Sequence, residues 1–156
     1  EKPIGAKIIN VESAREMYDA VFKNRPYNVA ICAAAVSDWY VDNKNSKKIK
    51  KSFLKSPQIS LKENPDILSD ISKSKNRPEL VIGFAAETDD LIKNAKSKLN
   101  QKGCDIIVAN KIDNKSSVFG NLENKVSIIS NDKTVHWPKM SKAEIGEKLS
   151  DLIENH

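Results

Sequence analysis

The sequence predicts a Rossmann-like α/β fold of three layers, with helices on both faces of a mostly parallel sheet and a C-terminal antiparallel hairpin. Apolar runs typical of strands alternate with stretches whose apolar residues recur at helical spacing. Towards the C-terminus, two short segments instead flank a turn, which is typical of a hairpin. The 156 residues, 39% of them apolar and 30% charged, suffice for a single domain that buries roughly 70% of its unfolded surface without disulfides or metals.

The first three elements expected are a strand, a helix and a second strand. Residues 7–11 are expected to form a short strand. Ser13 then opens a helix whose apolar side chains share one face, namely Ala14, Met17, Tyr18, Val21 and Phe22. Arg25-Pro26 ends this helix, and the mostly apolar residues 27–36 are expected to form a central parallel strand buried on both faces.

A long polar segment, residues 37–57, then interrupts the regular pattern. Loops of this length are usually functional or disordered, and we expect residues 41–57 to form a flexible lysine-rich flap. Order returns at residues 59–61. Asn64 is expected to cap a short helix that ends near residue 72, with Pro65 at its first position.

The second half of the chain is expected to alternate strands and helices before the hairpin. Residues 79–85 and 104–109 read as strands, and the helix between them is capped by Asp89 or Asp90 and stopped by Gly103. Residues 125–129 and 134–137 are expected to pair as the hairpin. Ser141 and Glu144 then have the spacing of a capping box at the start of a C-terminal helix.

The sequence lacks the residues that several kinds of catalytic or binding site require. With only His136 and His156 as histidines, a zinc site, a Ser-His-Asp triad and a Cys-His pair are not predicted. The chain has no GxGxxG or GxxxxGK[ST] motif, and no apolar run of membrane-spanning length. Cys32 and Cys104 lie in apolar runs and are expected to be reduced core residues of a cytoplasmic protein, although a disulfide between them stays open.

The net charge of +5 is weak evidence for nucleic-acid binding. Of the 26 basic residues only Arg15, Arg25 and Arg77 are arginines, and lysine is the poorer residue for bidentate recognition of bases or phosphates. The basic residues are also not interleaved with aromatic residues that could stack on bases. A nucleic-acid-binding module is therefore disfavoured.

Because ligands of parallel α/β sheets bind at the carboxyl ends of the strands, the polar segments that follow each predicted strand are the candidate site. Asp38 follows the small residues 33–35 and offers a carboxylate, although an ordinary Asx turn explains it equally well. The lysines of residues 48–51 could close over a polyanion, but a solvated charge run is the simpler interpretation.

Two further clusters complete this candidate site: residues 64–67, and residues 83–88 together with Lys98 and Lys102. Residues 64–67 could present free main-chain N–H groups to an anion, or merely start a capped helix. Phe84 could pack on a base or belong to the core. Lys98 and Lys102 lie one helical turn apart and could bind phosphate or simply complement the helix C-terminus. Lysines with one or two aspartates suit phosphoryl or nucleotidyl transfer.

Six motifs follow one another along the chain: AAAVSD (33–38), KIKK (48–51), ENPDIL (63–68), GFAAET (83–88), KLNQKGCDIIVAN (98–110) and VFGNLENKV (118–126). In this order they closely resemble phosphopantothenoylcysteine synthetase, the CTP-dependent ligase of coenzyme A biosynthesis. The resemblance also includes VESAREMYDAV (11–21) and covers essentially the whole chain. In bacteria this domain is usually fused behind an FMN-dependent phosphopantothenoylcysteine decarboxylase.

The resemblance implies the reaction and its residues. The family joins 4'-phosphopantothenate to L-cysteine through an acyl-cytidylate, and releases pyrophosphate and CMP. Lys48 and Asp38 are the implied catalytic residues, Ala34, Ala35 and Asp38 border the phosphopantothenate or acyl-cytidylate, and main-chain groups near Ala34 and Ile67 select cytosine. The implied CTP contacts are Cys32, Ala33, Ala34, Asp38, Lys48, Pro65, Asp66, Ile67, Leu68, Phe84, Lys98 and Lys102. Mg²⁺ is expected to accompany the triphosphate, with ligands that the sequence does not identify.

The family pattern also begins with a strand, a glycine turn and an Asn-Ser-Ser-Gly segment that precede the first motif found here. This chain is therefore expected to lack the first strand-helix unit of the ligase domain and its catalytic Asn. The family is dimeric, each site taking an Arg from the neighbouring subunit, so a homodimer is expected. The alternative hypothesis is a CTP-binding or dimerisation fragment without ligase activity.

Overall fold

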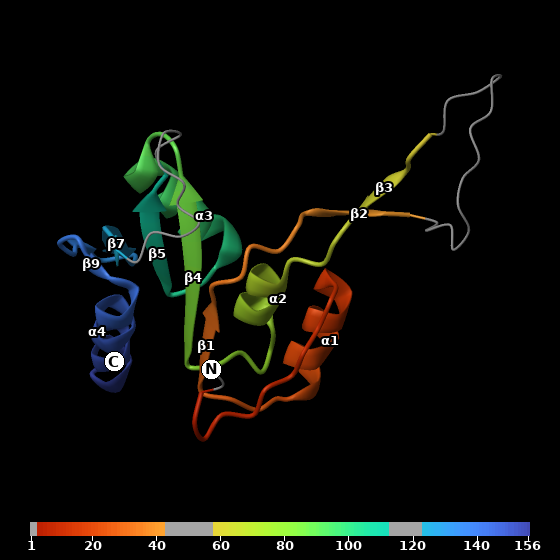
Figure 1. Cartoon of the computed structure of the whole chain (residues 1–156), viewed down its shortest axis with the longest axis horizontal. Helices are drawn as coiled ribbons and strands as arrows, with labels where there is room; N and C mark the ends of the chain where they lie inside the picture. The colour runs from red at the N-terminus through yellow and green to blue at the C-terminus, as the bar shows by residue number, and fades with distance from the viewer. Residues whose placement is uncertain (1–2, 43–57, 113–122) are drawn as a thin grey trace. The chain divides into compact units, whose positions relative to one another are not determined.

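The structure is a computed structural model of the chain and describes residues 3–42, 58–112 and 123–156 (Figure 1). The chain divides into two compact units. The first comprises Glu1–Arg25 and Ala35–Ile67, and the second comprises Pro26–Ala34 and Leu68–His156.

The second unit is built on a five-stranded sheet with the order β1-β4-β5-β7-β8. β1 (Val29–Cys32), β4 (Leu80–Glu87) and β5 (Ile106–Lys111) run parallel to one another. β7 (Val126–Ile129) and β8 (Thr134–His136) continue the sheet as an antiparallel hairpin. The predicted sheet and its C-terminal hairpin are therefore confirmed.

Helices cover both faces of this sheet. α2 (Ile67–Lys73) and α3 (Leu91–Lys102) share one face, because Leu68 lies against Gly83 of β4 and Lys73 lies against Gly103 at the end of α3. α4 (Lys142–Glu154) covers the opposite face, where its apolar side chains join those of three strands in the core. That core consists of Leu80, Ile82, Ile106, Val108, Val126, Ile128, Trp137, Ile145 and Leu149.

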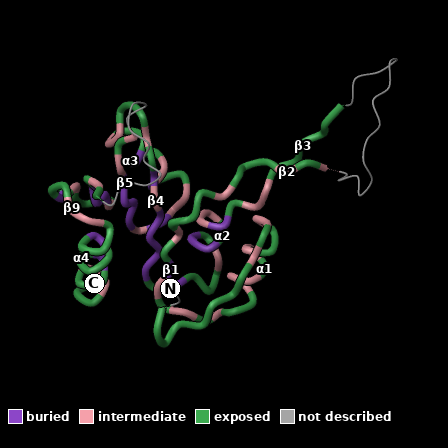
Figure 2. The backbone as a smooth tube through the Cα atoms, in the orientation of Figure 1, coloured by how far each residue is buried: buried purple, intermediate pink, exposed green. Residues whose placement is uncertain are grey.

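The first unit contains α1 (Ala14–Lys23) and a two-stranded antiparallel ribbon of β2 (Trp39–Val41) and β3 (Leu61–Glu63). Of its described residues only Ile67 is buried, as the green and pink tube of Figure 2 shows. Lys62 donates to Asp42 across the ribbon at 2.9 Å, and this hydrogen bond raises the pKa of Lys62. A second short ladder, in the second unit, joins β6 (Glu123–Asn124) to β9 (Met140–Ser141), which the sequence did not predict.

The predicted helix starts at Ser13 and Ser141 and the predicted helix stop at Gly103 are confirmed. Ser13 and Ser141 each accept the N–H of the glutamate three residues later, and each glutamate accepts the serine N–H in return. These reciprocal bonds satisfy two N–H groups that have no partner inside the helix. Gly103 ends α3 with φ 72°, a left-handed conformation in which glycine has no Cβ to clash, and its N–H donates to Leu99 O.

Two predicted strands differ in the structure. Residues 7–11 are described but form no strand, because no other described segment pairs with them. The strand predicted at 27–36 shrinks to β1 and lies at the edge of the described sheet, not at its centre. Among the described strands β1 pairs with β4 alone, and Ile31 is 48% exposed.

The segment around the polar loop also differs from prediction. Residues 39–41 form β2, although they were expected to be part of a loop. Asn64 does not cap α2, which begins only at Ile67. The reason is that Asn64 bonds to the strand opposite: its N–H donates to Asp38 O at 2.8 Å and its side-chain amide donates to Ser37 O at 2.9 Å. Asp90 precedes α3 as predicted, but its side chain makes no capping hydrogen bond.

Candidate functional site

In the second unit, the candidate site starts at the carboxyl ends of β1 and β4. Cys32, the last residue of β1, lies opposite Gly83 of β4, and Phe84 is the next residue of that strand. The chain leaves β1 through Ala33 and Ala34, which are exposed. The parallel pairing thus brings together Cys32, Ala33 and Ala34, three of the residues expected to contact CTP, beside Gly83. Phe84, a fourth expected contact, is partly buried and packs against the core on the face of the sheet that α4 covers.

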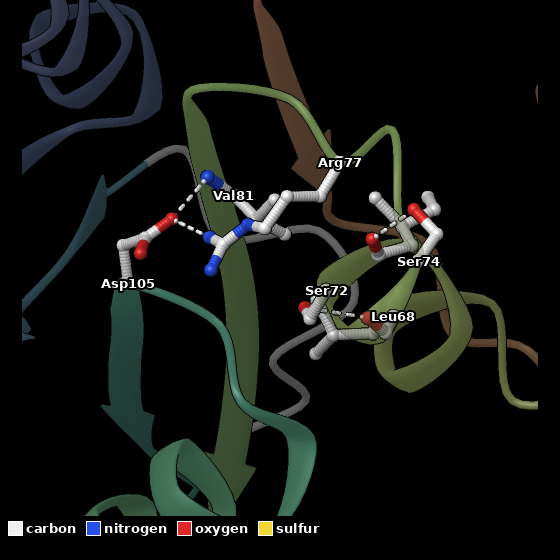
Figure 3. Close-up of polar contacts among 7 residues, drawn as sticks. Leu68, Ser72, Ser74, Arg77, Val81 and Asp105 are labelled. Carbon is white, nitrogen blue, oxygen red and sulfur yellow. Dashed lines mark hydrogen bonds and ion pairs between the residues drawn. The ribbon is translucent and has the colours of Figure 1, made fainter.

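Leu68, another expected contact, is brought to the same strand by α2. A Cβ built on Gly83 would lie 2.6 Å from Leu68 Cδ2, so the Leu68 side chain packs directly on the backbone of β4. α2 is held from its other end, where Ile71 is buried and Ser72 Oγ donates to Leu68 O at 2.7 Å (Figure 3). Leu68 is therefore fixed by the sheet below it and by its own helix.

α3 adds cationic and polar groups to this end of the sheet. Asn94, Lys98 and Lys102 follow one another at intervals of four residues and so lie on one side of the helix. Lys98 Nζ lies 3.8 Å from Glu87 Oε1 at the end of β4, and Asn94 Nδ2 donates to Glu87 Oε2 at 3.4 Å. The Glu87 carboxylate thus holds Lys98 near the carboxyl end of β4.

In the first unit, the remaining expected residues gather at the base of the ribbon. Asp38 directly precedes β2, and its carbonyl accepts the N–H of Asn64. This bond brings Asp38 close to the segment of Pro65 and Asp66, while the Asp38 side chain is exposed. Ala35 belongs to the same unit and is also exposed.

Some expectations fall outside what the structure describes. Lys48 and all but the first two residues of the 41–57 flap lie outside the described residues. Within the described ranges, no group of three or more His, Cys, Asp or Glu residues could hold a metal ion. No helix in those ranges is long and apolar enough to cross a membrane.

The two cysteines are free thiols. Cys104 is buried, and this burial raises the pKa of its thiol to about 11. Cys32 lies on β1 and Cys104 just before β5, with β4 between those strands. Backbones two strands apart are about 9.6 Å from each other, beyond the roughly 7 Å that a disulfide spans. The expectation of reduced cysteines therefore agrees with the sheet order.

Sequence reasoning did not single out Asn94 as part of this arrangement. Gly83 and Glu87 lie in the GFAAET segment that was already a candidate together with Lys98, and Asn94 precedes Lys98 by one helical turn. That spacing was available as a signal. The contact between Glu87 and Lys98 was not, because it depends on how α3 lies on the sheet.

All 156 residues match the model of the DNA/pantothenate metabolism flavoprotein C-terminal domain family. The chain belongs to this family. The resemblance inferred from the six motifs is thereby confirmed at the level of the family.

Curated relatives of the chain carry more than one name. The chain is 36% identical over 153 residues to the coenzyme A biosynthesis bifunctional protein CoaBC of Borreliella burgdorferi, covering 97% of the chain and 38% of that relative. It is 39% identical over 147 residues to a cysteine/cysteine sulfinic acid decarboxylase of an unknown prokaryotic organism, covering 94% of the chain and 40% of the relative. The chain thus spans less than half the length of these curated relatives.

Solved structures of the family share the fold. The C-terminal domain of a coenzyme A biosynthesis bifunctional protein CoaBC aligns over 99% of the chain and 67% of its own length, with a TM-score of 0.76 and 28% identity. The DNA/pantothenate metabolism flavoprotein from Streptococcus pneumoniae aligns over 99% of the chain and 75% of its own, with a TM-score of 0.75 and 21% identity, which supports the fold alone.

Proposed function

We propose that this chain acts in coenzyme A biosynthesis as part of a CTP-dependent phosphopantothenate–cysteine ligase. The observation that carries the proposal is the convergence beside β4, on the face that α2 and α3 cover: Cys32 of β1, Leu68 of α2 and the Glu87-bound Lys98 of α3 come from three different elements. In open α/β sheets the carboxyl ends of the strands are where ligands bind. Membership of the flavoprotein C-terminal domain family supports a role in pantothenate metabolism.

A carboxylate must be activated before it can form an amide bond, because a free carboxylate has no leaving group at neutral pH. A carboxylate oxygen of 4'-phosphopantothenate attacks the α-phosphorus of CTP, which forms an acyl-cytidylate and releases pyrophosphate. The amine of L-cysteine then attacks the acyl carbon, loses a proton, and releases CMP as the amide bond forms. The protein contributes position and positive charge, because negative charge develops on the phosphate oxygens.

Each expected residue has a distinct task in this proposal. Lys98, with Lys102 one turn further along α3, would neutralise phosphate charge, and Phe84 would pack on the cytosine ring. Asp38 and Lys48 are the proposed catalytic residues, Lys48 by neutralising charge at the α-phosphate. Mg²⁺ would be held mainly by phosphate oxygens and water, which suits described residues that form no carboxylate cluster of their own.

The proposal also covers the cellular location, the assembly and the partners of the ligase. We propose that the ligase works in the cytoplasm as a homodimer, with no nucleic acid or membrane as partner. A longer native chain could carry the FMN-dependent decarboxylase, which would act on the product of the ligation. The alternative is a fragment that binds CTP or dimerises without ligase turnover.

Calorimetric titration with CTP and with UTP, each with Mg²⁺, tests the nucleotide site. We expect selective CTP binding that weakens about tenfold in Lys98→Gln, since one desolvated charge contact to phosphate is lost. Lys96→Gln is the matched control because Lys96 is an exposed lysine of the same helix. Lys48→Ala tests the flap. Equal binding of CTP and UTP would rule out the proposed specificity.

Pyrophosphate release with phosphopantothenate present separates the ligase from the binding-only alternative. The ligase proposal expects CTP-dependent pyrophosphate release, followed by CMP release only when cysteine is added. Tight CTP binding without either product would favour the binding-only fragment.

A further inference from the structure

Gly83 occupies a place in β4 where no side chain fits. A Cβ built there would lie 2.6 Å from Leu68 Cδ2 and 2.9 Å from Ile107 Cδ1, whereas Cβ atoms in proteins essentially never approach other heavy atoms within 3.0 Å. Among the described residues the positive-φ glycines are Gly5 and Gly103, so Gly83 has an ordinary backbone conformation. Space, not backbone freedom, therefore explains the glycine.

The two neighbours of Gly83 differ in their freedom to move. Ile107 has 0% exposure and lies in β5, between β4 and β7. Close packing there resists displacement. Leu68 is only partly buried and stands near the start of a seven-residue helix. A side chain at position 83 would therefore displace mainly Leu68 and the first turn of α2.

We propose that Gly83 is a positioning residue whose missing side chain seats Leu68 and the start of α2 on β4. This inference rests on the proposed function, in which Leu68 and Phe84 contact the nucleotide. It deepens that function because it assigns the placement of a binding side chain to a residue that does not itself touch the ligand.

Gly83→Ala is the direct test, and the chain offers a matched control in Gly146→Ala. Gly146 lies in α4, where an added Cβ meets no atom within 4 Å. We expect Gly83→Ala to speed amide hydrogen exchange in the α2 segment, residues 68–73, by about tenfold, as overpacking loosens that helix. Gly146→Ala should leave exchange in this segment unchanged.

The same variants are titrated with CTP and Mg²⁺. Gly83→Ala should weaken CTP binding by about tenfold, because a displaced contact residue loses its productive position. Gly146→Ala should bind as the wild type does. Urea denaturation of each variant confirms that all are folded at the titration temperature, so that weaker binding reflects displacement and not unfolding.

Rescue separates positioning from simple packing. Leu68→Val shortens the side chain nearest to position 83, whereas Ile107→Val shortens the other neighbour. If Gly83 acts through Leu68, adding Gly83→Ala to Leu68→Val should weaken CTP binding no further. Adding Gly83→Ala to Ile107→Val should still weaken CTP binding by its full amount. Equal rescue by both would mean that Gly83 has only a packing role, and would overturn the inference.

The two readouts also separate this inference from the proposed function. If the wild type binds no CTP but Gly83→Ala still loosens α2, the seating of α2 by Gly83 holds and the nucleotide proposal fails. If the wild type binds CTP and Gly83→Ala changes neither exchange nor affinity, the inference about Gly83 is wrong and the nucleotide proposal stands.

Discussion

The five-stranded sheet of the second unit and the two-stranded ribbon of the first are stabilised in different ways. Ile82 and Ile107 in the sheet are 0% exposed, whereas Trp39 and Leu61 on the ribbon are 52% and 53% exposed. Full burial of such a side chain contributes about 1.5–3 kcal/mol, and an isolated two-stranded ribbon is only marginally stable in water. The sheet therefore carries the stability of the chain, and the ribbon depends on its hydrogen bonds and the Lys62–Asp42 ion pair.

Truncation of one side chain in each region should show the difference most strongly. We expect Ile82→Ala to lower the free energy of unfolding by about 3–4 kcal/mol, through lost burial and the cavity left behind. Leu61→Ala on the ribbon should change it by less than about 0.5 kcal/mol. Urea denaturation followed by circular dichroism measures both. Similar losses for the two variants would contradict the comparison.

Removal of a polar contact within the sheet should lower the free energy of unfolding by less than Ile82→Ala does. Asp105 accepts from Arg77 Nη2 and from the Val81 N–H, the latter at 2.7 Å (Figure 3). Asp105→Ala leaves the Val81 N–H without this acceptor, and we expect a loss of about 2 kcal/mol. Arg77→Ala keeps the bond to Val81 and should cost about 0.5 kcal/mol, because the ion pair is partly exposed. Thermal unfolding of both variants distinguishes the two contributions.

The matched capping boxes test whether the two units share one unfolding transition. Ser141→Ala should lower the free energy of unfolding by about 1 kcal/mol, the typical cost of a lost cap. We expect Ser13→Ala to speed exchange in α1 while leaving the transition of the sheet in place, since α1 has no buried residue. A full shift of the sheet transition by Ser13→Ala would show that the units unfold together.

This cap also has a pH dependence with a definite sign. Hydrogen bonds with Ser141 hold the pKa of Glu144 below its ordinary value of 4.5. A group whose pKa is lower in the folded state stabilises the fold above its unfolded pKa and loses that effect as the pH falls through the folded pKa. The difference between wild type and Ser141→Ala should therefore shrink on acidification below about pH 4.5.

The smallest expected effect is a loss of folding stability at alkaline pH, which comes from Cys104 in the second unit. The folded pKa of Cys104, about 11, lies above its ordinary value of 9.0. The raised pKa stabilises the fold below pH 9 and this contribution is lost as the pH rises towards 11. We expect a loss of about 0.4 kcal/mol between pH 7 and pH 9, absent in Cys104→Ala. Cys32→Ser is the control and should retain the loss.

Local signals in the sequence predicted much of the fold. The helix start at Ser13, the capping box of Ser141 and Glu144, Gly103 and the hairpin were predicted correctly because each depends on residues a few positions apart. The edge position of β1 was not predictable from its apolar run, because burial on both faces requires a neighbour on each side. Asn64 likewise has the composition of a cap, but it bonds to Ser37 and Asp38 instead.

In the candidate site too, local features could be predicted from the sequence and packing contacts could not. The strand-end position of Cys32 follows from the alternation of strands and helices, and Cys32 is the last residue of β1. Phe84 lies within β4 and packs against the core, which the alternation did not decide. The Glu87–Lys98 contact and the seating of Leu68 on Gly83 depend on how helices pack on the sheet. No sequence spacing encodes such packing directly.

The order of the strands also has a consequence for the course of folding. β7 and β8 pair across a short turn, whereas the residues paired between β1 and β4 are about fifty positions apart in the chain. Closing a loop of that length costs more entropy and slows assembly. We therefore expect the hairpin to form first and β1 to join last, so that pulsed hydrogen exchange should protect Ile128 before Ala30. The reverse order would show that the N-terminal half guides assembly, and β1 would then be the nucleus of the sheet.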